Sequence, residues 1–437
     1  MAAAFLPTAA IGATWTEPVR LSGSPSNAGD PTLAFSPDGR PFATWAERTG
    51  GLSHDPGELA ATLLAVRGAS GWSTGALPSG VLPLLVSVDA RGELLAVGRE
   101  FVSEGANEFP PRRITAWTSR SPAGEGAPVV RDRQIISRGH TTWFDGAATP
   151  RGDAAIAWTG TRGTAAKARL SVYAGTRRAG QRFTRPIRLS SEPLPRGRFP
   201  GAPVAIDPSG GAAVAWRDRS GIYVKVLRPG GRAGPRLEVG RARGDGNAFG
   251  VAIGPRGGLT VLWTRRSGDQ VVIVAGYSRD GKRFGKPRVL DTCLPPNGCP
   301  FLESASGPNG ELLTAWANRD GADPVVRAVS LRAGSGEVRE IDRGTTATND
   351  KVRVAADGKG NASVSWAAPY EEPTAGFRVA LRPPGGDFGP TEFVPAAGQT
   401  WPGPAIAFDP VSGTPAAVFT TGLTGVDDSP AWFTERR

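Results

Sequence analysis

Charged residues recur in this chain directly after short alternating runs, most of which end in tryptophan. Arginine is the commonest of them, and its planar guanidinium group can hold a carboxylate, sulfate or phosphate group through two parallel hydrogen bonds. Solvated loop arginines in an arginine-rich protein would give the same pattern. We take these as candidate ligand-binding residues: Arg48, Arg99, Arg162, Arg217, Arg219, Arg265 and Arg319.

Aromatic residues precede a second type of apolar run in the same repeating pattern. Flat rings beside arginines could form the floor of a site for an anionic sugar or a phosphate, although rings at these places could equally cap the packed interior. The aromatic candidates for ligand binding are Trp143, Phe199, Phe249 and Trp401.

Acidic residues in the same segments could provide acid–base chemistry, which requires two carboxylates, or a carboxylate and a tyrosine, that converge in space. The acids in question are Asp30, Glu47, Glu100, Asp145, Asp218, Asp245, Asp320, Asp350, Glu371 and Glu372. From these and the adjacent tyrosine we name as catalytic candidates Tyr370, Glu371, Glu372 and Asp218. Nearly every repeat contributes an acid, so the sequence does not tell which of them converge.

The two cysteines, Cys293 and Cys299, lie in a turn-rich segment that one disulfide could close in an oxidising compartment. The two histidines, His54 and His140, occur in distant loops and have no hydrolase-like pattern around them. Zinc requires about four ligands. We therefore expect no metal site and no cofactor.

These residues must be positioned by a repeated unit, of which the stretch from Leu33 to Trp45 is the clearest copy. An apolar run leads to a Pro-x-Gly turn, and a tryptophan follows six residues after the glycine. The turn glycines recur at intervals between 47 residues (Gly210 to Gly257) and 60 residues (Gly92 to Gly152). The eight turn glycines are Gly39, Gly92, Gly152, Gly210, Gly257, Gly310, Gly360 and Gly413, the second and the last belonging to degenerate copies.

A period near fifty residues is typical of a four-stranded propeller blade, whose strands we denote a to d. The last copy, Ala405 to Arg437, lacks a strand d, while an unpaired strand d, Trp15 to Leu21, precedes the first copy. We therefore predict an all-β fold, an eight-bladed β-propeller of four-stranded antiparallel blades that is closed by the N-terminal strand. Seven blades remain the alternative if the unit at Gly92 is not a blade.

Two consequences follow for the site and for the core. The a–b turns are short, whereas the b–c and d–a loops are long and varied, so we expect the functional site on the face that carries these loops. We expect the recurrent tryptophans to stack between neighbouring blades instead of binding a ligand.

The blade pattern resembles that of secreted bacterial β-propeller proteins of the broad sialidase-like group, from about Trp15 to the end of the chain. The resemblance is architectural. Ser36-Pro37-Asp38-Gly39 is similar to the Asp-box of sialidases, but its spacing is one residue shorter and Trp45 is too far on. Sialidases rely on an arginine triad, a Tyr–Glu pair and an acidic Asp, so the resemblance implies glycan chemistry without matching a specific enzyme family.

The net charge and the first residues of the chain bear on where the protein acts and what it binds. The 437 residues carry a net charge of +11, and residues 1–13 look like a truncated signal segment ahead of a single propeller domain over residues 14–437. No stretch approaches the roughly 18 apolar residues of a membrane helix. We predict a secreted, monomeric protein that binds an anionic glycan or an extracellular protein. We do not expect nucleic acid to be a partner. The alternative is a glycoside hydrolase or polysaccharide lyase of sialidase-like type.

Overall fold

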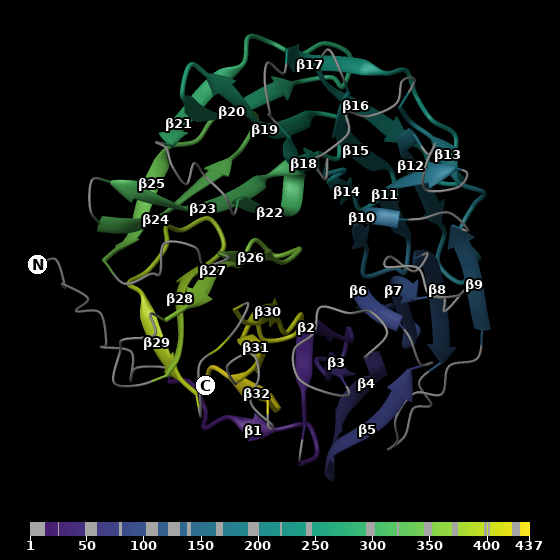
Figure 1. Cartoon of the computed structure of the whole chain (residues 1–437), viewed down its shortest axis with the longest axis vertical. Coiled ribbons are helices and arrows are strands. Elements are labelled where there is room, and N and C mark those ends of the chain that lie inside the picture. The colour runs from purple at the N-terminus through teal and green to yellow at the C-terminus, as the bar shows by residue number, and fades with distance from the viewer. Residues whose placement is uncertain are drawn as a thin grey trace, which may run out of the picture.

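Eight four-stranded antiparallel sheets form a ring around a central channel in the computed structural model (Figure 1). The structure describes residues 14–24, 26–48, 59–77, 81–101, 112–120, 132–137, 141–162, 169–190, 201–218, 221–241, 247–293, 302–320, 323–344, 352–368, 375–396, 400, 403–421 and 429–437. Each sheet is one blade, and its first strand lies next to the channel. The predicted all-β, eight-bladed propeller is confirmed, and the unit at Gly92 is a complete blade.

The strands of the first four blades follow the chain in order. Blade 1 contains β2 (Ala28–Phe35), β3 (Pro41–Arg48), β4 (Leu59–Gly68) and β5 (Gly71–Leu77). Blade 2 contains β6 (Val81–Val88), β7 (Glu93–Phe101), β8 (Arg112–Arg120) and β9 (Asp132–Ser137). Blade 3 contains β10 (Thr141–Ala148), β11 (Ala154–Arg162), β12 (Arg169–Arg177) and β13 (Ile187–Arg188). Blade 4 contains β14 (Val204–Ile206), β15 (Ala212–Arg217), β16 (Gly221–Leu227) and β17 (Leu237–Arg241).

The other four blades repeat this order, with one short 3-10 turn, η2 (Pro308–Gly310), in blade 6. Blade 5 contains β18 (Ala248–Ile253), β19 (Leu259–Ser267), β20 (Gln270–Ser278) and β21 (Arg288–Cys293). Blade 6 contains β22 (Leu302–Ser306), β23 (Leu312–Asp320), β24 (Asp323–Leu331) and β25 (Val338–Arg343). Blade 7 contains β26 (Arg353–Ala356), β27 (Ala362–Ala367), β28 (Gly376–Arg382) and β29 (Glu392–Pro395). Blade 8 contains β30 (Ala405–Phe408), β31 (Pro415–Thr420), β32 (Ala431–Glu435) and, from the other end of the chain, β1 (Val19–Arg20).

The two ends of the domain complete blade 8 together. Strand β1 pairs antiparallel with β32, so that Val19 lies opposite Phe433. Thr14 and Arg437 exchange backbone hydrogen bonds of 2.7 and 2.8 Å. The predicted closure by the N-terminal strand is confirmed, and β1 covers the edge of β32 that would otherwise be unpaired.

The a–b turns owe their tightness to a glycine and, in several blades, to an aspartate three residues before it. Gly210 adopts a φ of 85°, which costs glycine little because it has no Cβ. In the same turn Oδ1 of Asp207 accepts hydrogen bonds from the backbone N–H groups of Ser209 (2.7 Å) and Gly211 (3.0 Å). This carboxylate replaces water as a partner for the turn backbone, a local pattern typical of aspartate.

The recurrent tryptophans pack at the boundaries between blades, as predicted. Trp216 is fully buried and shares a cluster with Val172 and Ala174 of blade 3 and with Val214 of its own blade 4. Trp45, Trp158 and Trp263 occupy the corresponding boundaries of their blades. Small inner residues such as Ala155 and Ala157 leave room for the indole ring.

Removing one of these tryptophan side chains should destabilise the propeller. We expect Trp216→Ala to lower the free energy of unfolding by about 3–5 kcal/mol, because it removes buried surface and leaves a cavity at a blade boundary. Chemical or thermal denaturation measures the change. Trp143→Ala is the matched control, since Trp143 is 40% exposed and should contribute much less. An unchanged melting curve for Trp216→Ala would contradict the packing role.

Candidate functional site

Several predicted site residues lie outside the described residues, and these stay predictions. They are Tyr370, Glu371, Glu372, Arg219, Phe199, Trp401 and Cys299, together with the side chains of Arg162 and Arg319. Cys293 is buried at the end of β21, but the predicted disulfide requires Cys299 and is therefore not described. Residues 1–13, the predicted signal segment, also lie outside the described part of the chain.

The catalytic candidate Asp218 is held by its own blade. It is buried after β15, and its Oδ2 accepts a hydrogen bond of 3.1 Å from Nη1 of Arg236. The guanidinium group of Arg236 lies 4.4 Å from the centre of the Tyr223 ring. Asp218 thus connects strands β15, β16 and β17, and it is absent from the described channel wall.

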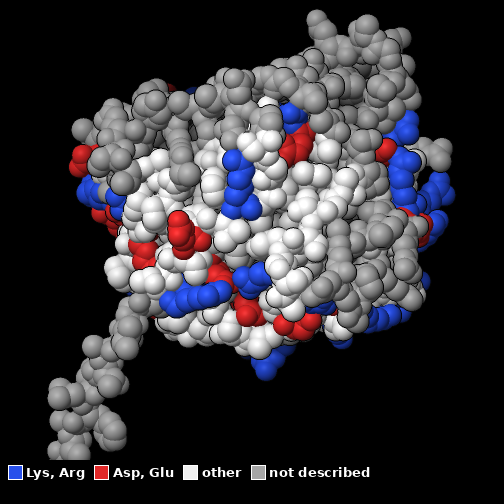
Figure 2. Space-filling view, turned by 90° about the horizontal axis from the view of Figure 1, so that it is seen from below, with Lys and Arg blue, Asp and Glu red and all other residues white. Residues whose placement is uncertain are grey.

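The described candidate arginines do not converge on one point of the channel. Arg48, at the end of β3, forms an ion pair of 2.9 Å with Asp30. Arg99 and Arg217 are half-buried in β7 and β15, and Arg265 is exposed in β19. Figure 2 shows Lys and Arg side chains interspersed with Asp and Glu side chains on the described surface of one side of the ring.

Two of the loop acids serve structural roles. Oε1 of Glu47 accepts hydrogen bonds from Nε1 of Trp45 (2.7 Å) and from the hydroxyl group of Ser26 (2.8 Å). Burial acts to raise the pKa of Glu100, but hydrogen bonds from Arg133 and Thr115 outweigh it and hold the pKa below its ordinary value. Both carboxylates are therefore held by neighbouring side chains.

The inner strands of all eight blades line a cavity of about 610 Å³ along the channel. Its wall is mainly small and apolar, with alanines such as Ala147 and Ala355 and larger residues such as Val354 and Ile406. This volume falls in the range of small-molecule sites, in which a few polar groups on an apolar wall orient the ligand. The channel is therefore a candidate site for a small ligand.

Three charged residues occur at one level of the inner strands, and we call them the charged layer: Asp145 of β10, Glu303 of β22 and Arg353 of β26. Each lies seven residues before the turn glycine of its blade. Nη1 of Arg353 lies 3.6 Å from Oε2 of Glu303. Seven residues before their own turn glycines, the other five blades have uncharged residues, namely Thr32, Leu85, Pro203, Gly250 and Ile406.

Asp145 lines the cavity, whereas Glu303 and Arg353 are not among the described residues of its wall. Oδ2 of Asp145 accepts the backbone N–H of Val204 in blade 4 (2.8 Å), and its Oδ1 accepts the N–H of Gly146 (2.8 Å). Although the side chain is only half-buried, the channel walls exclude enough water to raise the pKa of Asp145 to about 6, and the negative charge of Glu303 adds to this rise. The two backbone hydrogen bonds oppose the shift without cancelling it.

Trp143 lies two residues before Asp145, so both side chains are on the same face of β10. The strand bulges between Thr141 and Trp143, and bulges commonly redirect a side chain next to a functional site. The indole edge lies 3.8 Å from where a Cβ atom of Gly201 would be, so the glycine leaves room for the ring. The structure thus places a 40% exposed tryptophan beside the charged layer.

Phe249, another predicted aromatic, lies at a bulge of β18 and contributes to the channel wall. The structure therefore brings Trp143 and Phe249 to inner strands, whereas Arg48 and Asp218 belong to other parts of their blades. Sequence reasoning included Asp145 among ten acids but missed Glu303 and Arg353. Their constant distance from the turn glycine was the signal that could have found them.

Neither a membrane-spanning segment nor a metal centre is found among the described residues. No helix there is long and apolar enough to cross a bilayer. No group of three or more His, Cys, Asp or Glu side chains in the described ranges is placed to hold a metal ion.

Comparison with known proteins gives an architecture without a family. No protein-family model matches the chain, and no curated protein matches it. Among solved structures, the NanB sialidase of Streptococcus pneumoniae is similar with a TM-score of 0.40 and 9% identity, over 97% of this chain and 98% of the sialidase chain. An ulvan lyase is similar with a TM-score of 0.43 and 11% identity, over 86% and 96% of the two chains.

A third similar structure is the α-L-arabinanase of Penicillium chrysogenum, with a TM-score of 0.37 and 13% identity over 68% of this chain and 92% of the arabinanase chain. The expected likeness to sialidase-like propellers is thus confirmed, without a specific family. Since all three TM-scores are below 0.5, nothing about binding or activity follows from them.

The raised pKa of Asp145 predicts a pH-dependent effect of Asp145→Asn. Ionisation of Asp145 is disfavoured in the folded protein, so its contribution to stability is lost as the pH rises from the ordinary pKa of 3.8 to about 6. The variant cannot ionise, so its unfolding free energy relative to the wild type should rise over this interval and then level off. The rise is at most about 3 kcal/mol, and less because channel water screens the charge.

Denaturant unfolding of both proteins between pH 3.5 and pH 8 tests this dependence. Asp207→Asn, in the a–b turn of blade 4, controls for the general effect of losing a carboxylate. A constant difference between Asp145→Asn and the wild type across the series would show that the environment of Asp145 does not raise its pKa.

Proposed function

We propose that the protein binds a glycan at the channel, with Trp143 as the aromatic platform and the charged layer as the polar partner. The observation that carries this proposal is the exposed indole of Trp143 on the same face of β10 as Asp145. A pyranose ring has an apolar C–H face that packs on an aromatic ring, while its hydroxyl groups require donors and acceptors close by. Trp143 and Asp145 supply these two requirements two residues apart.

The charged layer supports a ligand with acidic sugars. Arg353 is the cation of the layer and could contact a uronic acid carboxylate, while Glu303 and Asp145 accept hydrogen bonds from hydroxyl groups. With a pKa of about 6, Asp145 can also donate a hydrogen bond when it is protonated in mildly acidic solution. We place this activity outside the cell, in line with the signal-like segment at residues 1–13, with an extracellular glycoprotein as one form of the ligand.

Glycan microarray screening followed by calorimetry of the best ligand tests the proposal. We expect Trp143→Ala to weaken binding about tenfold or more, because a central aromatic anchor usually contributes above 1.4 kcal/mol. Arg353→Gln should weaken acidic ligands more than neutral ones. Val411→Ala, an exposed residue of the a–b turn of blade 8, serves as the control and should bind normally. Equal affinity of Trp143→Ala and the wild type would refute the proposed platform.

Hydrolysis is a second candidate function, favoured by the raised pKa of Asp145 beside the charge of Glu303. A carboxyl group that holds its proton near neutral pH can protonate a glycosidic oxygen, and a second, ionised carboxylate can activate water or stabilise the charge that develops on the sugar. The predicted catalytic residues Tyr370, Glu371 and Glu372 remain a separate possibility for the same chemistry.

Turnover and binding separate the two candidates. If the protein hydrolyses the glycan, wild type should release new reducing ends and Asp145→Asn should bind but not release them. If it acts as a lyase, products should absorb in the ultraviolet as unsaturated uronic acids. If the wild type binds the glycan without turnover, the result supports the binding function and contradicts the catalytic one.

A further inference from the structure

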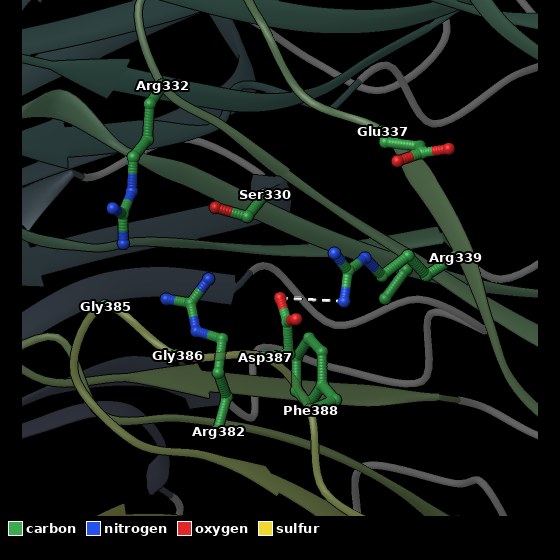
Figure 3. Close-up of a pocket in the computed structure, with 10 residues that line it drawn as sticks. Ser330, Arg332, Glu337, Arg339, Arg382, Gly385, Gly386, Asp387 and Phe388 are labelled. Carbon is green, nitrogen blue, oxygen red and sulfur yellow. Dashed lines mark ion pairs between the residues drawn. The ribbon is translucent and has the colours of Figure 1, made fainter.

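A second cavity lies away from the channel, between blades 6 and 7, and has a volume of about 210 Å³. Its walls come from β24 and the turn that follows it, from β25, and from β28 with the turn after it (Figure 3). We call it the interblade pocket. None of its described lining residues belongs to the charged layer or the channel wall.

A buried ion pair lies at the interblade pocket, and Arg382 is the member of the pair that lines the cavity. Glu311 and Arg382 have side chains only 2% and 4% exposed, and Nη1 of Arg382 donates to Oε1 of Glu311 at 2.7 Å. The hydroxyl group of Ser330 donates to the same oxygen, and Nε of Arg332 lies 3.6 Å from it. Burial acts to raise the pKa of Glu311, but these hydrogen bonds and charges outweigh it and keep the carboxylate ionised.

The ion pair leaves one edge of the Arg382 guanidinium group without a partner. Within the described residues, both Nε and Nη2 of Arg382 are buried and form no hydrogen bond. These two nitrogens form the parallel pair of donors that holds a carboxylate, sulfate or phosphate group through two hydrogen bonds. Buried donors without partners are costly, so this edge favours an oxygen-bearing ligand or ordered water.

Two further arginines approach the same space. Figure 3 shows the guanidinium groups of Arg332 and Arg382 reaching toward each other, with the Ser330 hydroxyl nearby, and Arg339 approaching from the other side. Arg339 is paired with Asp387 at 2.7 Å. Glu337 also lines the pocket, but Figure 3 shows it directed away from Arg332 and Arg382. The end of the pocket near Arg332 is therefore positively charged.

A smaller cavity occupies the equivalent position between blades 2 and 3, and we call it the closed cavity. Its buried pair is Glu93 with Arg177, and there Nη2 of the arginine donates to the glutamate, so that only Nε of this edge is left without a hydrogen bond among the described residues. The side-chain amide of Gln134 accepts a hydrogen bond from the N–H of Phe183 (2.7 Å) and donates to its carbonyl oxygen (2.8 Å). That cavity has a volume of only about 70 Å³.

Several wall residues of the interblade pocket differ from those of the closed cavity, and three of the differences change the size or the charge of the cavity most. Arg339 lies opposite Ala328 of β24 in the strand register. Gln134 lies opposite Ala116 of β8 in the same way, so an arginine stands where the closed cavity has the bridging amide. Gly386 takes the place of Gln181, since each lies two residues before a phenylalanine of the wall, Phe388 or Phe183. The glycine removes a side chain from the wall. Asp387 takes the place of Arg182 and pairs with Arg339, so the added arginine is balanced within the wall, and the loss of the two glutamine side chains accompanies the larger cavity.

We propose that the interblade pocket binds a sulfate or phosphate group, held by the Nε–Nη2 edge of Arg382 and by Arg332. The cavity exceeds the size of a bare ion, so it can also admit the first atoms of an ester to which the group is attached. The site is separate from the channel, and its occupation does not depend on the proposed glycan-binding function.

Calorimetric titration of the full chain with inorganic sulfate, inorganic phosphate and glucose 6-phosphate tests the proposal and separates a free ion from an ester. Arg382→Lys keeps a positive charge next to Glu311 but loses the donor edge, and Arg332→Gln removes a cation whose side chain is half exposed. We expect each variant to bind at least tenfold more weakly. Arg177→Lys, the same change in the closed cavity, is the matched control and should bind as the wild type does.

Direct binding is measured because sulfate and phosphate stabilise most proteins nonspecifically by exclusion from the surface, which would raise every melting temperature. Circular dichroism of each variant establishes that it is folded, and Arg332→Gln carries the test alone if Arg382→Lys does not fold. Absence of saturable binding up to about 50 mM for all three probes would overturn the proposal. Equal binding by Arg332→Gln, Arg177→Lys and the wild type would overturn it as well.

Discussion

The packing of each blade against the next through a buried tryptophan is the interaction on which the rest of the structure depends. A single four-stranded sheet has two faces to cover, and in this ring each face is covered by a neighbouring blade instead of by helices. Trp216 and its equivalents fill the wider part of each boundary, while alanines near the channel fill the narrow part. This taper fixes the distance of the inner strands from the axis and so produces the channel that Asp145 lines.

Because the blades share one frame, differences between them are informative. Glu303 and Arg353 occupy a level where most other blades have uncharged residues, and Arg339 and Gly386 occupy positions that are closed by glutamine side chains in the equivalent cavity. Neither set of changes is needed to form a blade, since the other blades form without them. Residues that depart from the repeat are therefore the best guide to function here, more than the residues that define it.

The fold could be predicted from the sequence because its determinants are local and repeated. The glycine in each a–b turn and the tryptophan six residues later set the period, and the orphan strand near Val19 revealed the closure. The candidate site could not be predicted to the same extent. Asp145 was recognised only as one acid among ten, because its raised pKa depends on channel walls from several blades and on Glu303, far along the chain. The exposure of Trp143 depends on a bulge in β10 that its residue types do not signal.

Completion of blade 8 by both ends of the domain has a consequence for how the protein is made. The hydroxyl groups of Thr16 and Thr434 are 3.3 Å apart although 418 residues separate them along the chain. During synthesis β1 emerges first and has no partner until β32 has been translated, so the ring cannot close before then. Intermediate blades can assemble side by side through contacts within about a hundred residues, but the last step requires a contact of very high sequence separation, which is slow. Until that step, β1 and the open faces of the first and last blades are exposed to other chains.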